Sequence, residues 1–173
     1  MFNFYQSIIR LFFSCLLASV FWITPNTFLS GDKLSAQAVQ PFAGLVGRWV
    51  GEGRLGYSSG QNEKIRCRLT YFVKEEGHKL KQNIRCGTSG AKIEIKSDIL
   101  HDQGKLSGTW RETTYDMKGS LRGRVTPEGF VVFVKSERID AIMQISQNAK
   151  RQIVEIQFRG SEIIGMTLGL RKG

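Results

Sequence analysis

Residues 64–86, KIRCRLTYFVKEEGHKLKQNIRC, decide the fold. Apolar residues alternate with charged or polar ones on both sides of Glu76 and Gly77, a pattern typical of two half-buried strands joined by a turn. A turn centred between Glu76 and Gly77 makes the following pairs: Val73 with Leu80, Tyr71 with Gln82, Leu69 with Ile84, and Cys67 with Cys86. A slip of one residue would destroy all of these matches at once, so the register is strongly specified.

The same register predicts a disulfide between Cys67 and Cys86. Directly opposed residues lie about 4.5–5.5 Å apart at Cα, which suits a disulfide. A four-residue loop over residues 75–78 would put the cysteines at the closer, non-hydrogen-bonded kind of site, whereas a two-residue loop would put them at the wider kind. The sequence leaves both loops open. The alternative to the bridge is two free thiols.

Period-two alternation continues along the chain, broken by Gly, Asn and Asp, and no long stretch has helical periodicity. One turn of helix fits residues 41–46. The pattern predicts an all-β domain over residues 39–173. Its expected strands are Arg48–Tyr57, Lys64–Lys74, Lys79–Cys86, Lys92–Leu100, Leu106–Thr113, Ser120–Val125, Phe130–Lys135, Ala141–Ser146, Gln152–Phe158 and Ile163–Leu170.

Residues 1–38 have the features of a secretory signal peptide. Arg10 precedes an uncharged apolar run over residues 11–23, which is short for a membrane span, and Ala36-Gln37-Ala38 offers a small-x-small cleavage site. We therefore expect a periplasmic or secreted protein, not integral to the membrane after cleavage. An uncleaved anchor is the alternative. Cleavage would remove Cys15 and leave an even pair of cysteines, as a disulfide in an oxidising compartment requires.

The chain is basic, with 25 Lys and Arg against 15 Asp and Glu, and its 41% hydrophobic content excludes global disorder. The predicted hairpin gathers seven cations on its outer face. They are Lys64, Arg66, Arg68, Lys74, Lys79, Lys81 and Arg85. This basic patch suits an anionic envelope component or an acidic protein face. The alternative is an ordinary solvated face that protects the sheet from aggregation. Nucleic acid is not an expected partner of an exported protein.

Two glycine motifs lie near residue 50. Residues 51–56, GEGRLG, match the G-x-G-x-x-G pattern, but a turn rather than a helix follows, so we interpret these glycines as bends in a strand. Gly47-Arg48-Trp49 precedes them. This G-x-W on a first strand resembles the calycin superfamily, and the string GRWVGEG resembles the opening of its nitrobindin-like group. The whole chain also resembles a group of small exported bacterial proteins of unknown function.

The resemblance implies a single antiparallel up-and-down β-barrel of about 8–10 strands. It also implies that a cation near the end of the last strand caps the tryptophan, which assigns barrel closure to Trp49 and Arg171. Nitrobindin-like proteins hold haem through a histidine on a late strand. Here the only histidines are His78 and His101, both at predicted turns. We therefore expect no cofactor and no metal site.

No catalytic residues stand out, because the sequence has no G-x-S-x-G elbow and its carboxylates do not single out a pair. We therefore expect a binding protein rather than an enzyme. The favoured function is binding of a small hydrophobic molecule or lipid inside the barrel. The candidate lining residues are Trp49, Tyr57, Leu69, Tyr71, Gln82, Trp110, Phe133 and Met143. A dry core is the alternative for the interior. An envelope interaction module that uses the basic patch, such as an enzyme inhibitor or structural protein, is the alternative function.

Overall fold

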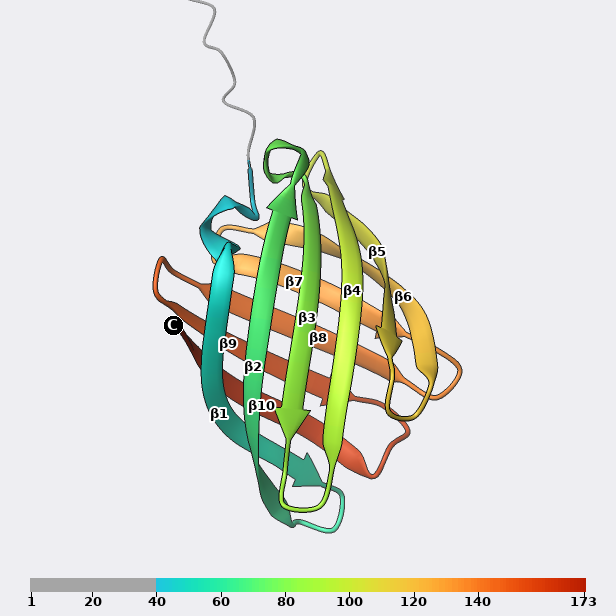
Figure 1. Ribbon diagram of the computed structural model, residues 1–173. Helices are drawn as coiled ribbons and strands as arrows, with labels where there is room; N and C mark the ends of the chain where they lie inside the picture. Colours follow the sequence, from blue (N-terminus) through green and yellow to red (C-terminus); the bar gives the residue numbers. More distant parts are fainter. Residues whose placement is uncertain (1–39) are drawn as a thin grey trace, which may run out of the picture. The chain divides into compact units, whose positions relative to one another are not determined.

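The computed structural model describes residues 40–173, so the predicted signal peptide over residues 1–38 lies outside the described residues. A short 3-10 helix, η1 (Ala43–Leu45), leads into ten strands (Figure 1). Their bounds are β1 (Gly47–Tyr57), β2 (Asn62–Lys74), β3 (Lys79–Gly87), β4 (Lys92–Asp102), β5 (Lys105–Glu112), β6 (Met117–Thr126), β7 (Gly129–Lys135), β8 (Asp140–Gln147), β9 (Arg151–Phe158) and β10 (Ile163–Lys172). A second 3-10 turn, η2 (Glu75–Gly77), joins β2 to β3.

The strands form a closed antiparallel barrel in which each strand pairs with its neighbours in sequence and β1 also pairs with β10. The all-β, up-and-down barrel prediction is therefore confirmed. All ten expected strands are present, with ends shifted by up to three residues. The largest shift is at β6, which begins at Met117 rather than Ser120, because Asp116 takes a positive φ of 49° and completes the turn early.

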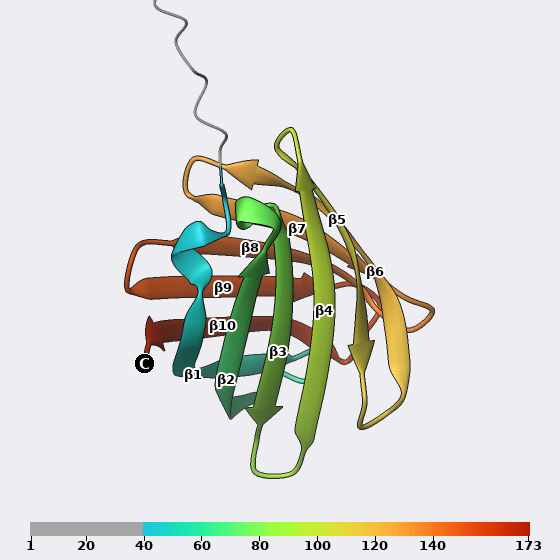
Figure 2. The ribbon, with the colours of Figure 1, turned by 45° about the horizontal axis from the view of Figure 1, so that its top comes forward.

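The barrel is flattened, and its two walls cross. Strands β1 to β4 run steeply along one wall, and β8 to β10 cross behind them at a large angle (Figures 1 and 2). Gly51 and Gly53 permit this crossing where β1 meets β10. A Cβ atom at either position would collide with a backbone carbonyl oxygen of β10, that of Gly169 or of Thr167. The glycines of the GEGRLG string therefore allow close backbone contact at a barrel corner.

The predicted register of the β2–β3 hairpin is confirmed. Cys67 lies opposite Cys86 and Tyr71 opposite Gln82, and residues 75–78 form the four-residue loop. The two cysteines form a disulfide with a Cα–Cα distance of 4.1 Å, which fits the closer kind of antiparallel site. Both side chains are buried on the inner face of the wall.

One end of the barrel is closed by a plug, which we define as Phe42, Leu45 and Trp49. All three side chains are at most 2% exposed, and the Trp49 Nε1–H donates a 2.7 Å hydrogen bond to the Leu45 carbonyl. The cation over Trp49 is Lys172, with Nζ 5.7 Å from the ring centroid, so the prediction of Arg171 was wrong. The alternation of side chains along β10 explains the error. Leu170 points into the barrel, so Arg171 points outward and Lys172 returns to the inner side, where it pairs with Trp49 of β1.

Replacement of Gly53 by alanine tests the barrel corner. We expect Gly53→Ala to lower the free energy of unfolding by about 3 kcal/mol, because the new methyl group must displace the β10 backbone. Urea titration measures this change. Gly90→Ala is the matched control, since a Cβ there meets nothing within 4 Å, and it should be nearly neutral. Equal stability of the two variants would contradict this account of the corner.

Reduction of the disulfide tests the hairpin. The bridge closes a loop with a sequence separation of 19 residues, so its loss should lower the free energy of unfolding by about 3 kcal/mol. Urea titration with and without a reductant measures the effect. A Cys67→Ala, Cys86→Ala variant should show the reduced stability under both conditions. A wild-type protein insensitive to reductant would contradict the expectation.

Candidate ligand-binding cavity

The barrel encloses a cavity of about 440 Å³. Apolar side chains from nearly every strand form its wall. They include Leu55, Ile65, Leu69, Ile84, Ile93, Ile95, Val134, Met143, Ile145, Ile156, Met166 and Leu168. Several of them point inward yet are only half-buried, among them Ile84, Met143 and Met166. Inward side chains that solvent can still reach indicate a hollow interior open at one end.

The mouth lies at the end opposite the plug. Five turns of four residues each surround this end (Figure 1): residues 58–61, 88–91, 113–116, 136–139 and 159–162. Thr88, Tyr115 and Ile139 from these turns line the cavity. Tyr115 is 56% exposed although it lines the cavity, which places its ring at the rim.

Four inward residues with polar atoms lie side by side on one wall. The strand registers pair Tyr71 with Gln82, Gln82 with Ser97, and Ser97 with Trp110. All four side chains line the cavity, and none is more than 9% exposed. We call this set the polar row. It crosses β2, β3, β4 and β5 at one level of an otherwise apolar wall.

The hydrogen bonds of the polar row are only partly complete. The Tyr71 hydroxyl donates to Gln152 Oε1 at 3.0 Å, which ties β2 to β9, and burial raises the pKa of Tyr71 far above its usual range. Gln82 Nε2 donates to Ser97 Oγ at 3.1 Å. The Trp110 indole nitrogen has no partner among the described residues. It lies over Gly119, where a Cβ would be 2.7 Å from Nε1.

Two carboxylates lie near the mouth, and both are engaged. Glu63 accepts hydrogen bonds from Ser89 Oγ at 2.8 Å and from the Tyr57 hydroxyl at 2.9 Å, which lower its pKa. Glu112 is 1% exposed and accepts backbone N–H groups from the 113–116 turn. Burial raises the pKa of Glu112, but these N–H groups more than offset it, and the net shift is downward. Both groups therefore stay ionised at neutral pH.

Six of the eight predicted lining residues lie on the cavity wall. They are Tyr57, Leu69, Tyr71, Gln82, Trp110 and Met143. The other two predictions were wrong. Trp49 belongs to the plug and is fully buried against Leu45. Phe133 is 46% exposed on the outer face, because the inward positions of β7 are Phe130, Val132 and Val134.

Sequence reasoning missed Ser97, Glu112 and Gln152, which are buried polar residues of the interior. Alternation carried a signal for the first two. Ser97 falls between the inward positions Ile95 and Ile99, and Glu112 follows Trp110 at the same spacing. Nothing in the local pattern identified Gln152 as the partner of Tyr71, because the two are 81 residues apart.

All seven residues of the basic patch lie on the outside of β2 and β3, but acidic neighbours pair with four of them. Lys81 Nζ lies 3.2 Å from Asp98 and Arg85 Nε 3.2 Å from Glu94, both on β4. Two further ion pairs complete the set: Arg66 with Glu52 at 3.7 Å, and Lys79 with Glu75 at 3.1 Å. In the described part of the chain Lys64, Arg68 and Lys74 have no such partner. The sequence prediction did not include these acids because they lie outside the two strands of the hairpin.

The two histidines meet beside the plug. His101 Nε2 accepts the Gly104 N–H at 2.9 Å, so its proton lies on Nδ1, from which it can donate to His78 Nδ1 at 3.2 Å. The His101 ring also packs edge-on against Phe42 of the plug. Within residues 40–173 no third potential ligand completes a metal-binding group with them. Burial and then the neighbouring His78 lower the pKa of His101, and Asp102 opposes them.

The histidine pair predicts a pH dependence of stability. Since the pKa of His101 is lower in the folded state than in the unfolded state, the unfolded chain takes up protons first as the pH falls. Stability should therefore fall from about pH 7 to about pH 5, the range in which the histidine of the unfolded chain takes up its proton. Urea titrations at both pH values measure it. His101→Asn should remove most of this dependence, and an unchanged dependence in that variant would contradict the assignment.

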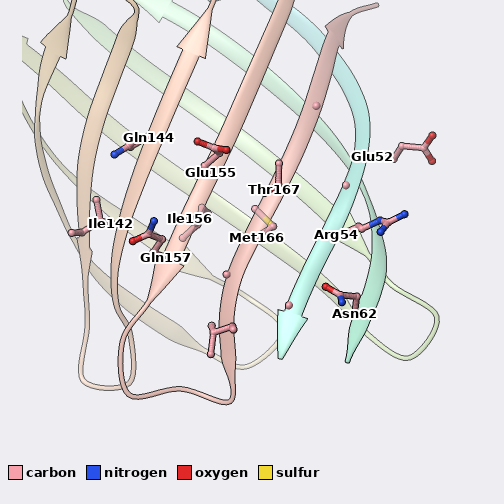
Figure 3. Close-up of a pocket in the computed structure, with 15 residues that line it drawn as sticks. Glu52, Arg54, Asn62, Ile142, Gln144, Glu155, Ile156, Gln157, Met166 and Thr167 are labelled. Atoms are coloured by element: carbon pink, nitrogen blue, oxygen red, sulfur yellow. The ribbon is translucent and has the colours of Figure 1, made fainter. Parts of the chain in front are cut away.

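A separate groove of about 620 Å³ runs along the outside of the barrel where β1 and β10 meet (Figure 3). Gly56, Gly165 and Gly169 leave this surface hollow because they carry no side chains. Glu52, Arg54 and Glu155 line it together with neutral polar side chains (Figure 3). Its charges are mixed, and it shares only a few wall residues with the interior cavity.

Comparison with known proteins yields the fold only. No family model and no curated protein matches the chain. One similar solved structure is the S-type phycobiliprotein lyase CPES from Guillardia theta, which is 11% identical, with a TM-score of 0.52. The match covers 75% of this chain and 88% of the lyase chain. In the part of the chain that the structure describes, no helix has the length and hydropathy needed to span a membrane.

Proposed function

We propose that this barrel binds a small apolar molecule in its interior. The observation that carries the proposal is the cavity of about 440 Å³ with an apolar wall and one open end. Ligand sites in proteins are typically preformed cavities of about 300–1,000 Å³, with mostly apolar walls and a few placed polar groups. A dry core fits less well, because packed interiors contain few voids larger than a water molecule.

The structural neighbour adds limited support. The phycobiliprotein lyase has a similar fold, so the fold is compatible with a protein that acts on another molecule. At 11% identity its activity does not transfer to this chain. That this chain is no enzyme stays a prediction. Its export also stays a prediction, and the Cys67–Cys86 disulfide agrees with an oxidising compartment.

The alternative function, an envelope interaction module that uses the basic patch, has weaker support. Ion pairs with Glu52, Glu75, Glu94 and Asp98 engage four of its seven cations. Exposed pairs of this kind reduce the local positive potential that an anionic partner would meet. The observations therefore favour the interior over the outer face.

Filling the cavity tests the proposed function. Val134 lines the cavity, whereas Phe133, its neighbour on β7, faces solvent. We expect Val134→Trp to weaken binding of phenylnaphthylamine, a neutral apolar dye, at least tenfold, because the indole occupies the space that the dye needs. Phe133→Trp is the matched control and should bind like the wild type. Dye fluorescence titration measures both affinities.

Two results would contradict the function. One is a wild-type protein that binds no dye and releases no small molecule when the purified protein is extracted with organic solvent and the extract is examined by mass spectrometry. The other is equal dye binding by Val134→Trp and Phe133→Trp, which would place the dye outside the barrel. Circular dichroism and urea titration establish that both variants are folded.

A further inference from the structure

We infer that the cavity selects a neutral amphipathic ligand, an apolar chain that carries one uncharged hydrogen-bonding group such as an amide or an alcohol, and that Gln82 and Ser97 bind this group. The inference rests on the proposed function, since it concerns what the same cavity prefers. Its observations are the unused hydrogen-bonding atoms of the polar row and the charges around the cavity.

The polar row offers both a donor and an acceptor to a ligand. Ser97 Oγ accepts from Gln82 Nε2, which leaves the Ser97 hydroxyl proton available. Gln82 Oε1 has no hydrogen-bond partner among residues 40–173. The two side chains are 9% and 4% exposed, so their groups are out of bulk water. Polar atoms that face an otherwise apolar cavity find few partners there, so a ligand that supplies one acceptor and one donor would pair with them.

The two ends of the polar row, Trp110 and Tyr71, offer no group to a ligand. The Trp110 indole N–H is buried against Gly119 of β6, where a Cβ would lie 2.7 Å from Nε1, so a ligand does not reach it. Tyr71, on the other side of Gln82, is already satisfied by Gln152 and carries no spare proton. The atoms that a ligand can engage therefore lie on β3 and β4, at Gln82 and Ser97. A ligand head group with two hydrogen-bonding atoms matches this spacing better than a hydrocarbon does.

The charges around the cavity disfavour an anionic head group. Among the lining residues that the structure describes, no side chain is a Lys, an Arg or a His, and the only charged ones are Glu63 and Glu112. A carboxylate moved from water into this cavity would find no cation to pair with. It would also pass two ionised carboxylates near the mouth. A cationic head group would be attracted to these carboxylates, but it would lose its hydration in an otherwise apolar interior, and hydrogen bonds from the protein already hold both carboxylates in place.

A set of three matched probes tests the inference: decanamide, decanoate and pentylbenzene. They supply a neutral hydrogen-bonding group, an anion and a wholly apolar molecule. Affinities are measured at neutral pH by displacement of phenylnaphthylamine from the full protein. We expect decanamide to bind at least tenfold more tightly than decanoate. Equal or tighter binding of decanoate would overturn the inference and leave the proposed function intact.

A Gln82→Met, Ser97→Ala variant then tests the two side chains. It keeps the volume of the wall and removes the polar atoms, so decanamide should lose about tenfold in affinity while pentylbenzene stays within about twofold. Asn83→Ala is the matched control, since Asn83 is the outward neighbour of Gln82 on β3. Unchanged decanamide binding by the double variant would overturn the role of these residues.

The remaining outcomes are also decisive. If the wild type binds none of the three probes, the proposed function fails and the inference fails with it. If the double variant does not fold, as judged by circular dichroism, the comparison of decanamide with decanoate on the wild type still decides the preference for a neutral ligand. Pentylbenzene binding by the double variant shows that its cavity is intact.

Discussion

The close contact between β1 and β10 is the constraint on which the rest of the molecule depends. Without side chains at Gly51 and Gly53, the two strands can pair in very close contact at the barrel corner and close the sheet. Closure removes the sheet edges and fixes which side chains face inward. It also brings Tyr71 of β2 within reach of Gln152 of β9, so that a hydrogen bond can span the interior. A bulkier first strand would leave these residues apart.

Much of the fold could be predicted because alternation is a local signal. The charged and apolar residues around Glu76 fixed the hairpin register, and with it the cysteine pair, without any knowledge of the other strands. Prediction failed where alternation is lost. Residues 130–134, FVVFV, are all apolar, so the sequence does not say which face Phe133 occupies. The resemblance placed the cation that caps Trp49 at Arg171, one residue before Lys172. An error of one residue in a strand moves the side chain to the opposite face of the sheet.

The candidate site was predictable only in part, because a cavity depends on the space between strands and not on the order of residues along one strand. Tyr71 and Gln82 could be placed on the inner face from their own strands. That the interior is hollow depends on how far apart the two crossed walls lie, which no stretch of sequence records. Ser97 and Trp110 can be recognised as part of the polar row only when β3, β4 and β5 are aligned, because the register then places them beside Gln82. The ion pairs that engage the basic patch depend in the same way on contacts beyond the hairpin, such as those with β4.

The five four-residue turns around the mouth have a consequence for kinetics. A turn this short is held at both ends by its own hairpin and has no free length with which to fold over the opening. If the interior binds a molecule as proposed, exchange past these turns requires only rotation of rim side chains such as Tyr115, which occurs in nanoseconds or faster for exposed residues. The residence time would then be set by how well the wall holds the occupant, since none of the described turns can act as a lid.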